Sequence, residues 1–398
     1  MKPLFTMSFV EILFWLSVAI LVYCYVGYGI LLFLLNHIKR IFLPTLKPVA
    51  FDLLPVTLIV TAYNEEDILL QKIKNTLQID YPFDLLNVIF IIDGSSDGSA
   101  EIIRKYDSIT LLHEPGRKGK LAAIRRAMRF VQTPVVVFSD ANSMLNAGCM
   151  KAILSHYSNE KIGGVAGEKK ILNNHSSLVG QAEGWYWKYE SFMKQQDANF
   201  NTVVGAAGEL FSIRTELFYS LEDHLILDDF IISMQVCLSG YKIAYEPLAY
   251  AMEAPSISLA DEEKRKTRIA AGAYQSIYYS KQCLNIIKYP LLSIQYFSRR
   301  LLRWIACPVL IMLVLLTNLW LVAHQQGAIF SSLLFVQGIF YLFVLAGRIF
   351  LAAGWRMGIL NIPFYFIFMN LCLVKGFINY IQGRQTVLWE KSMREAIE

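Results

Sequence analysis

The chain has 398 residues, of which 55% are hydrophobic, and its formal net charge is +5 at pH 7. Such an apolar composition is unusual for a purely soluble protein and favours several membrane helices beside one folded domain. The basic residues stand mainly beside apolar runs, where they suit anionic lipid headgroups, so the composition argues against binding to nucleic acid.

A membrane helix is expected near the N-terminus. Residues 12–35 contain no charged side chain, and about 20 apolar residues suffice to cross the hydrocarbon core as a helix. The run is too long and too aromatic for a secretory leader. Lys39, Arg40 and Lys47 follow, and by the positive-inside rule they place the next domain in the cytoplasm. Residues 1–45 are therefore interpreted as an N-terminal transmembrane helix and linker.

An α/β domain is predicted over residues 46–285. Short apolar runs typical of strands alternate with segments of helical spacing, the strands at 56–60, 88–92 and 134–138 and the helices at 65–78 and 99–106. Continuous apolar strands that alternate with helices imply a mostly parallel sheet with helices on both faces.

Membrane segments are expected again after this domain. The stretch 286–304 is amphipathic and carries three arginines among aromatic residues, which is typical of a helix lying in the membrane interface. Within residues 305–380, uncharged apolar runs predict C-terminal transmembrane helices, with segments at 304–323, 328–347 and 357–374.

The basic residues near the C-terminus conflict with three such spans. Three spans would leave the tail at 381–398 outside the cell, whereas Lys375, Arg384, Lys391 and Arg394 favour the inside. One of the three runs is therefore expected to be re-entrant or interfacial.

The cysteines and histidines predict neither disulfides nor a zinc site. No two of the six cysteines form a CxxC pair, and the six histidines show no HExxH spacing. This pattern favours a reduced, cytosolic domain.

Polar clusters follow three of the predicted strands, at residues 61–66, 93–99 and 139–142. Ligands of open α/β sheets bind outside the carboxyl ends of the strands, so the three clusters together predict one site. Each cluster alone has a second interpretation, because Asp, Asn and Ser after a strand also begin helices.

The third cluster contains Asp140-Ala141-Asn142, whose carboxylate can hold Mg²⁺ or Mn²⁺ against a diphosphate, since these hard cations prefer oxygen ligands. Upstream, residues 116–120 form a flexible basic segment that can approach phosphate oxygens. The alternative for that segment is a solvated surface loop.

Two adjacent carboxylates, Asp228 and Asp229, follow an apolar stretch further along the chain. One of them can act as the general base that takes a proton from an attacking hydroxyl. The alternative is the ordinary acidic charge at a helix N-terminus.

Taken together, these residues resemble the family 2 glycosyltransferases, which are inverting GT-A enzymes, and particularly membrane-embedded members such as hyaluronan, cellulose and poly-N-acetylglucosamine synthases. The resemblance covers about residues 56–269. It implies an α/β GT-A domain of the Rossmann-like, nucleotide-diphospho-sugar transferase type, combined with transmembrane α-helices.

The resemblance also implies roles for individual residues. It assigns donor binding to the opening motif, the nucleotide-binding aspartate, the lysine that faces the diphosphate and the metal-binding aspartate. In the order of these features, the donor-binding residues are Thr61, Ala62, Tyr63 and Glu65, then Asp93, Lys120 and Asp140. Asn142 stands where many members carry a second metal-binding Asp. Asp229 is the expected base beside Asp228, and Arg268 is expected to neutralise the leaving group.

A glycine-containing segment resembles the loop near the acceptor site, with Gly205, Gly208 and Glu209 on the acceptor side. Its glycines permit close backbone approach. An ordinary turn is the alternative.

The main departure from the family pattern lies at Arg265-Lys266-Thr267-Arg268-Ile269, in the place of the Gln-x-x-Arg-Trp motif of processive members. Arg268 matches, but Ile269 replaces the acceptor-stacking Trp and Arg265 replaces the Gln. These differences argue against processive polymerisation. Ile92 and Arg125 depart at positions that bear on donor preference.

The sequence therefore predicts a membrane-bound inverting glycosyltransferase that moves a sugar from a nucleotide-diphosphate donor, a UDP-sugar, to a lipid-linked or polysaccharide acceptor in cell-envelope or exopolysaccharide synthesis. The expected cofactor is Mg²⁺ or Mn²⁺. The expected location is a bacterial inner membrane with the catalytic domain cytoplasmic, beside other envelope-biosynthesis proteins. The alternatives are a processive synthase that exports its polymer and a catalytically inactive membrane scaffold.

Overall fold

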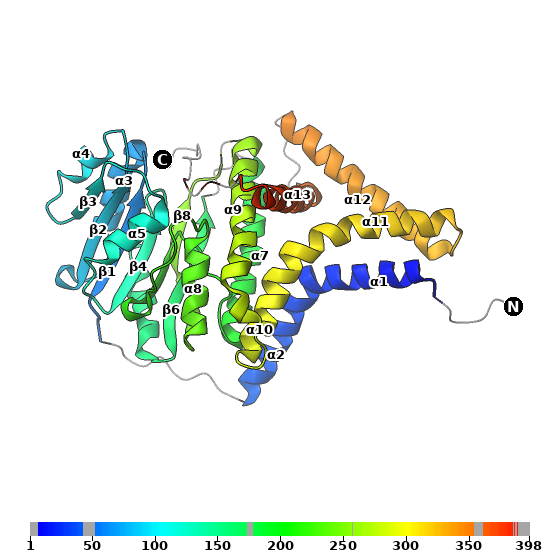
Figure 1. Cartoon of the computed structure of the whole chain (residues 1–398), viewed down its shortest axis with the longest axis horizontal. Helices are drawn as coiled ribbons and strands as arrows, with labels where there is room; N and C mark the ends of the chain where they lie inside the picture. The colour runs from blue at the N-terminus through cyan, green and yellow to red at the C-terminus, as the bar shows by residue number, and fades with distance from the viewer. Residues whose placement is uncertain are drawn as a thin grey trace.

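The strands of the α/β region form one mixed sheet (Figure 1). The computed structural model describes residues 7–42, 52–172, 178–256, 258–353, 361–384, 386 and 388, and in these the sheet has eight strands in the order β3-β2-β1-β4-β7-β6-β8-β5. Their bounds are β1 Val56–Ala62, β2 Leu86–Asp93, β3 Thr110–Glu114, β4 Val135–Asp140, β5 Met144–Leu145, β6 Ile162–Ile171, β7 Phe211–Arg214 and β8 Lys242–Glu253.

Half of the sheet is parallel and the other half is mixed. β1 pairs in parallel with β2 and β4, and β2 pairs in parallel with β3. β7 then runs antiparallel to both β4 and β6. β8 is parallel to β6 and antiparallel to β5. The parallel half contains the strands predicted from apolar runs, and β1 is buried along its whole length because helices cover both of its faces.

Short helices cover the two faces of the sheet, and alternate strand residues divide between two cores. Ile59 and Phe138 belong to the core under α5 (Lys120–Met128) and α8 (Asp228–Leu238). Leu58, Val60 and Phe90 face the opposite core, which includes residues of α3 (Glu66–Leu77), α4 (Ser99–Ile103) and α6 (Cys149–Ser155). The strand period of two residues sets this division.

Long helices stand beside the sheet domain (Figure 1). Their bounds are α1 Phe9–Val22, α2 Tyr28–Phe42, α7 Leu178–Phe200, α9 Leu259–Tyr279, α10 Pro290–Tyr296, α11 Cys307–Ala323, α12 Ala328–Ala352 and α13 Ile362–Ile381. The π-helical segments η1 (Tyr23–Gly27) and η6 (Phe297–Ala306) join α1 to α2 and α10 to α11.

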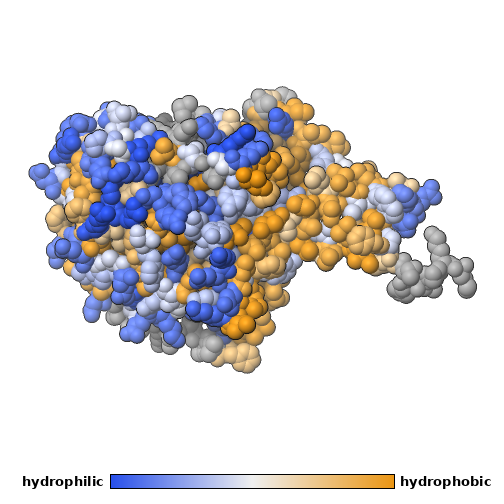
Figure 2. Space-filling view, in the orientation of Figure 1, coloured by the Kyte–Doolittle hydropathy of each residue, from blue (hydrophilic) through white to orange (hydrophobic). Residues whose placement is uncertain are grey.

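Within the described residues, four helical segments are long and apolar enough to cross a membrane, namely Phe9–Phe42, Pro290–Ala323, Ala328–Leu351 and Ile362–Ile381. Figure 2 shows the apolar surface concentrated on this group of helices, beside the more polar surface of the sheet domain. α1 and α11 pack against each other, whereas α13 packs against α9 of the domain.

The segment 286–304, expected as a separate interfacial helix, is described differently by the structure. Pro290–Ala323 is one continuous helix, so the boundary expected at residue 304 falls inside it. Arg299 is 3% exposed and binds Glu190 and Asp197 of α7. The opposite, apolar face of this segment is exposed at Ile294 and Phe297. The arginine therefore faces the domain instead of lipid headgroups.

The structure describes the last apolar run from Asn361 onward, with α13 beginning at Ile362 and Pro363 in its first turn. Residues 354–360 lie outside the described residues, as do Lys47, Lys391 and Arg394, which entered the topology prediction. The expectation that one C-terminal run is re-entrant or interfacial stays a prediction.

Candidate active site

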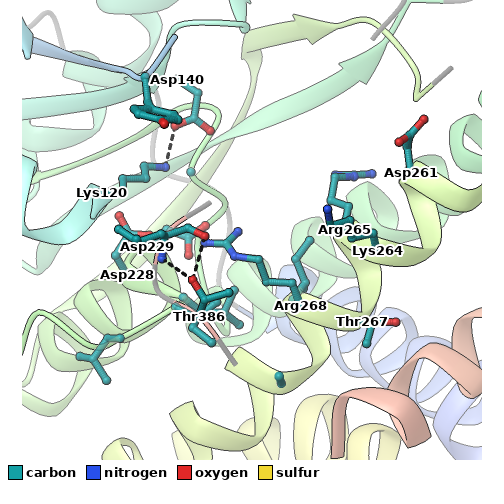
Figure 3. Close-up of a pocket in the computed structure, with 18 of the residues that line it drawn as sticks. Lys120, Asp140, Asp228, Asp229, Asp261, Lys264, Arg265, Thr267, Arg268 and Thr386 are labelled. Atoms are coloured by element: carbon teal, nitrogen blue, oxygen red, sulfur yellow. Dashed lines mark hydrogen bonds and ion pairs between the residues drawn. The ribbon is translucent and has the colours of Figure 1, made fainter. Parts of the chain in front are cut away.

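Most of the candidate residues line one cavity of about 770 Å³ outside the carboxyl ends of β1 and β4 (Figure 3). Those that line it are Thr61, Tyr63, Glu65, Lys120, Asp140, Asn142, Gly208, Glu209, Asp228, Asp229 and Arg268. Ala62 and Asp93 are buried behind the cavity wall, and Gly205 lines a neighbouring cavity.

Lys120 and Asp140 form an ion pair in one wall of the cavity. Asp140 ends β4 and Lys120 begins α5, and the Lys120 Nζ lies 2.6 Å from the Asp140 Oδ1. Burial lowers the pKa of Lys120, but the carboxylates of Asp140, Asp228 and Asp229 outweigh burial and hold that pKa above its ordinary value. Lys120 is therefore a fixed positive charge.

Asp93 anchors the basic segment that carries Lys120. Its fully buried carboxylate accepts hydrogen bonds from the backbone N–H groups of Lys118, at 3.0 Å, and Gly119, at 2.7 Å. Gly119 has a φ of 97°, a conformation that favours glycine. Asp93 also lies 3.6 Å from a guanidinium nitrogen of Arg126. The expected role of Asp93 in donor binding stays a prediction.

The side chains of Asp229, Lys120 and Asp140 all approach Gly208. A Cβ added to Gly208 would lie 2.8 Å from the Lys120 Nζ, 3.3 Å from the Asp229 Oδ2 and 3.7 Å from the Asp140 Oδ2. Burial and the neighbouring Asp228 raise the pKa of Asp229 to about 7, although Lys120 opposes them. A carboxyl group with such a pKa is suited to take up and release a proton near neutral pH.

Arg268 extends from α9 toward Asp228 and Asp229 (Figure 3). Its Nε is buried and has no hydrogen-bond partner among the described residues. A buried guanidinium N–H is costly to leave without an acceptor, so this group is suited to bind an anionic ligand.

A second cavity of about 550 Å³ adjoins the first, and Asp229, Glu209, Leu227, Arg265 and Ile269 line both. This second cavity, which we call the acceptor cavity, extends between α7, α9, η6 and α13. Gly205 lies in its wall, and aromatic rings including Trp187 and Trp304 line it. Ile269, which stands where the sequence lacks the expected Trp, lines the same cavity as these aromatic side chains.

Comparisons with known proteins bear on the family and the fold of the chain. Residues 57–221 match the family model described as Glycosyl transferase family 2. The chain contains a family 2 glycosyltransferase domain. This region carries Lys120, Asp140 and Gly208, whereas Asp229 and Arg268 lie beyond the matched residues.

Two bacterial relatives are similar to about half of the chain. The poly-β-1,6-N-acetyl-D-glucosamine synthase of Staphylococcus aureus is 25% identical over 232 residues, which cover 55% of each chain. A probable glycosyltransferase of Bacillus subtilis, YdaM, is 25% identical over 244 residues, which cover 56% of each chain. The chain spans about half the length of the curated relatives it matches.

A solved structure shares the fold over nearly the whole chain. The mannosyltransferase PcManGT of Pyrobaculum calidifontis, solved with GDP-Man and Mn²⁺, superposes with a TM-score of 0.68 at 18% identity and covers 94% of this chain and 100% of its own. The GT-A fold predicted from the sequence is therefore confirmed, together with helices long enough to span a membrane.

The residues that the family 2 domain offers to a metal are Asp140 and Asn142. No group of three or more His, Cys, Asp or Glu side chains suited to a metal occurs among the described residues. Mg²⁺ and Mn²⁺ at phosphate sites need only one or two carboxylates, because the substrate phosphates supply further oxygens. Asp140 is 29% exposed to the cavity through its side chain, so this donor set fits a metal held jointly with a diphosphate.

Sequence reasoning missed the buried charges behind Asp140. The Lys72 Nζ, fully buried, donates to the Ser139 Oγ at 2.9 Å. Lys169 binds both Glu209 and Glu253, the latter at 2.6 Å. The sequence contained one sign of these buried charges. Lys72 lies on the same helix face as the buried Leu69 and Ile73, and a lysine on such a face requires a buried partner. These contacts fix the end of β4 and the Glu209 side chain.

Proposed function

We propose that this protein is a membrane-bound inverting glycosyltransferase that moves a sugar from a nucleotide-diphosphate donor, a UDP-sugar, to a lipid-linked or saccharide acceptor in cell-envelope synthesis. The observation that carries the proposal is the convergence of Lys120, Asp140 and Asp229 around Gly208. One cavity then contains cationic groups that can bind the departing diphosphate and a carboxylate that can act as the base for the acceptor hydroxyl. The donor would lie on one side of these groups and the acceptor on the other.

The reaction is a single displacement. Asp229 removes the proton of the acceptor hydroxyl, and the oxygen attacks the anomeric carbon from the face opposite the diphosphate. Lys120 and Arg268 stabilise the negative charge of the leaving diphosphate, a contribution on the order of 3 kcal/mol for one such group. Asp140 and Asn142 would hold Mg²⁺ or Mn²⁺, which supplies further positive charge to the diphosphate.

The proposed location is a bacterial inner membrane, with the family 2 domain on the cytoplasmic side. Four helical segments of spanning length and composition support insertion, and Lys39 and Arg40 at the domain end of the first segment support this orientation. The relatives named above come from bacteria.

The test uses the purified full-length protein with a panel of UDP- and GDP-sugars and Mn²⁺ or Mg²⁺, with nucleotide release as the signal. Asp229→Asn should lower transfer by about 10²- to 10⁴-fold, the usual contribution of a general base, and leave nucleotide binding nearly intact. Asp80→Asn is the matched control, because Asp80 is exposed and pairs with Lys151 at the surface. Persistent transfer by the Asp229 variant would show that the base is another residue.

One observation favours a second candidate, a processive polysaccharide synthase. Trp187 and Trp304 line the acceptor cavity beside Ile269, so aromatic stacking of a sugar does not depend on the missing Trp. One bacterial relative is also named as a polysaccharide synthase. Product length, measured with radiolabelled donor, separates the two candidates, because a processive enzyme releases long chains even at low conversion.

A further inference from the structure

Five cationic side chains line the acceptor cavity among the described residues, and three of them have carboxylate partners. Arg265 and Lys266 pair with Glu262, and Arg303 pairs with Glu190. The other two cations are Lys194 of α7 and Arg300 of η6.

Neither Lys194 nor Arg300 forms an ion pair with a carboxylate in the described part of the chain. Lys194 is 5% exposed and lines the cavity, and burial lowers its pKa. The Arg300 guanidinium donates to the backbone carbonyl of Val204 at 3.0 and 2.6 Å, and it lies 5.5 Å from the ring centres of Phe230 and Trp304. Lys194 is buried and Arg300 is half-buried. Removing a cation from water without a counter-ion is costly, so an anionic ligand would stabilise both.

The carboxylates near Lys194 are already bound by other groups. Glu209 pairs with Lys169, and Glu190 pairs with Arg299 and Arg303. Glu168 accepts hydrogen bonds from the hydroxyls of Ser191 and Tyr245. The Oε2 of Glu209 is buried without a hydrogen-bond partner among the described residues. None of the three carboxylates forms an ion pair with Lys194 there, so its ammonium group can still bind an anionic ligand.

Part of the wall of the acceptor cavity is apolar and belongs to a candidate membrane span. Phe366, Met369 and Leu373 of α13 and Ala270 and Ala273 of α9 line this part of the cavity. α13 is one of the four segments of spanning length and composition. A ligand that fits this cavity therefore combines an anionic group with an apolar chain, and its reacting end lies near Asp229, which lines the same cavity.

We propose that the acceptor is a saccharide joined through a phosphate or diphosphate to a long-chain lipid, with the phosphate held by Lys194 and Arg300 and the lipid chain lying along the apolar side chains of α13 that line the cavity. This inference rests on the proposed function, since it assigns the acceptor of the same reaction. The hydroxyl of the lipid-linked sugar is the group that Asp229 deprotonates.

A binding experiment tests whether Lys194 and Arg300 bind the phosphate, and it does not require sugar transfer. Full-length protein in detergent is dialysed against radiolabelled farnesyl diphosphate, farnesol or pyrophosphate, with excess UDP and Mn²⁺ to occupy the donor side. Farnesyl diphosphate should bind at least tenfold more tightly than either other probe, and Lys194→Met and Arg300→Met should each weaken its binding about tenfold, the usual effect of losing one charge-assisted hydrogen bond.

Two further variants control for charge and folding. Lys188→Met removes an exposed lysine from the same helix and should bind like the wild type. Arg300→Lys keeps the charge and should bind more tightly than Arg300→Met. Equal binding of farnesol would show that the cavity recognises only apolar chains, and equal binding of pyrophosphate would assign the site to a soluble phosphate. Either result, or wild-type affinity in both Met variants, overturns the proposal.

A transfer experiment separates this inference from the proposed function. The acceptors are a farnesyl-diphosphate-linked sugar and the farnesyl glycoside of the same sugar, which lacks phosphate. Lys194→Met should raise the KM for the phosphate-containing acceptor about tenfold and leave both the KM for the neutral glycoside and donor hydrolysis unchanged. Equal use of both acceptors by the wild type overturns the inference while the transferase function stands. Absence of both transfer and donor hydrolysis would overturn the function itself.

Discussion

Asp229 lies in the first turn of α8, where burial and the adjacent Asp228 raise its pKa to about 7. A general base acts in its deprotonated form, so the rate of transfer should fall as the pH drops below about 7. Asp228→Asn removes the neighbouring negative charge, which lowers the Asp229 pKa and should move the acidic limb of the profile to lower pH. The measurement is kcat/KM against pH for both proteins, and an unchanged acidic limb would contradict this assignment.

Gly208 leaves room for the side chains around it, and a methyl group there would force the end of the Lys120 side chain to move. The Cβ of an alanine would lie 2.8 Å from the Lys120 Nζ and 3.3 Å from the Asp229 Oδ2. Gly208→Ala should therefore displace one of these groups and lower kcat/KM roughly 10²-fold, the cost of a misplacement of about 1 Å. Gly148→Ala is the control, because only the Asn146 amide lies near the added atom, at 3.9 Å. Unchanged activity of the Gly208 variant would argue against this geometry.

Cavity-lining residues that belong to motifs were easier to predict from the sequence than the buried residues that support them. Asp140 and Asp229 follow apolar segments within recognisable motifs, so their positions in the cavity could be expected. Lys169 and Lys194 stand in no motif, and their importance depends on side chains far away in the sequence, such as Glu253 for Lys169. No local pattern encodes such contacts, because burial and charge pairing are set by the tertiary fold.

At the scale of elements, α13 approaches α9 closely at Gly376. A Cβ on Gly376 would lie 2.4 Å from the Ala270 Cβ and 2.8 Å from the backbone N of Ala271, and neither atom can move without the whole helix. Gly376→Ala should push α13 away from α9 and destabilise the protein by about 1–3 kcal/mol, as overpacking usually does. It should also reduce the rate of sugar transfer, because a shift between the two helices would move Arg268, which α9 carries into the active-site cavity.

Gly338→Ala in α12 is the matched control, since no atom lies within 4 Å of its added Cβ. Thermal unfolding of both variants in the same detergent measures the difference. If both variants unfold at the wild-type temperature, the close approach of the two helices does not contribute to stability.

A hydropathy pattern predicts where a strand or helix occurs but not which residues its polar face contacts. Apolar runs predicted β1, β2 and β4, because a strand buried on both faces has a continuous apolar sequence. The pattern of 286–304 predicted a helix with one polar face but not what that face contacts. Arginines in a membrane interface and arginines in buried ion pairs give the same spacing, and here Arg299 binds Glu190.

At the scale of the whole molecule, a buried set of charges joins the family 2 domain to two apolar segments. Glu190 and Asp197 of α7 bind Arg299, and Glu190 also binds Arg303 at 2.6 Å. From the first apolar segment, the Tyr28 hydroxyl donates to Asp197 at 2.6 Å. The acceptor cavity lies beside these contacts and is lined by α7, η6 and α13. The position of the cavity therefore depends on how the domain and the helices fit together.

Removal of Arg299 should weaken that junction strongly. Arg299→Met leaves the buried carboxylate of Asp197 without its cation and deprives Glu190 of one of two, a change that typically costs about 3–5 kcal/mol. The unfolding temperature should fall well below that of Arg129→Met, which removes an exposed arginine. Arg299→Met combined with Asp197→Asn should recover part of the loss, because the unpaired negative charge is then gone. A double variant no more stable than Arg299→Met alone would show that the ion pair does not join the domain to the helices.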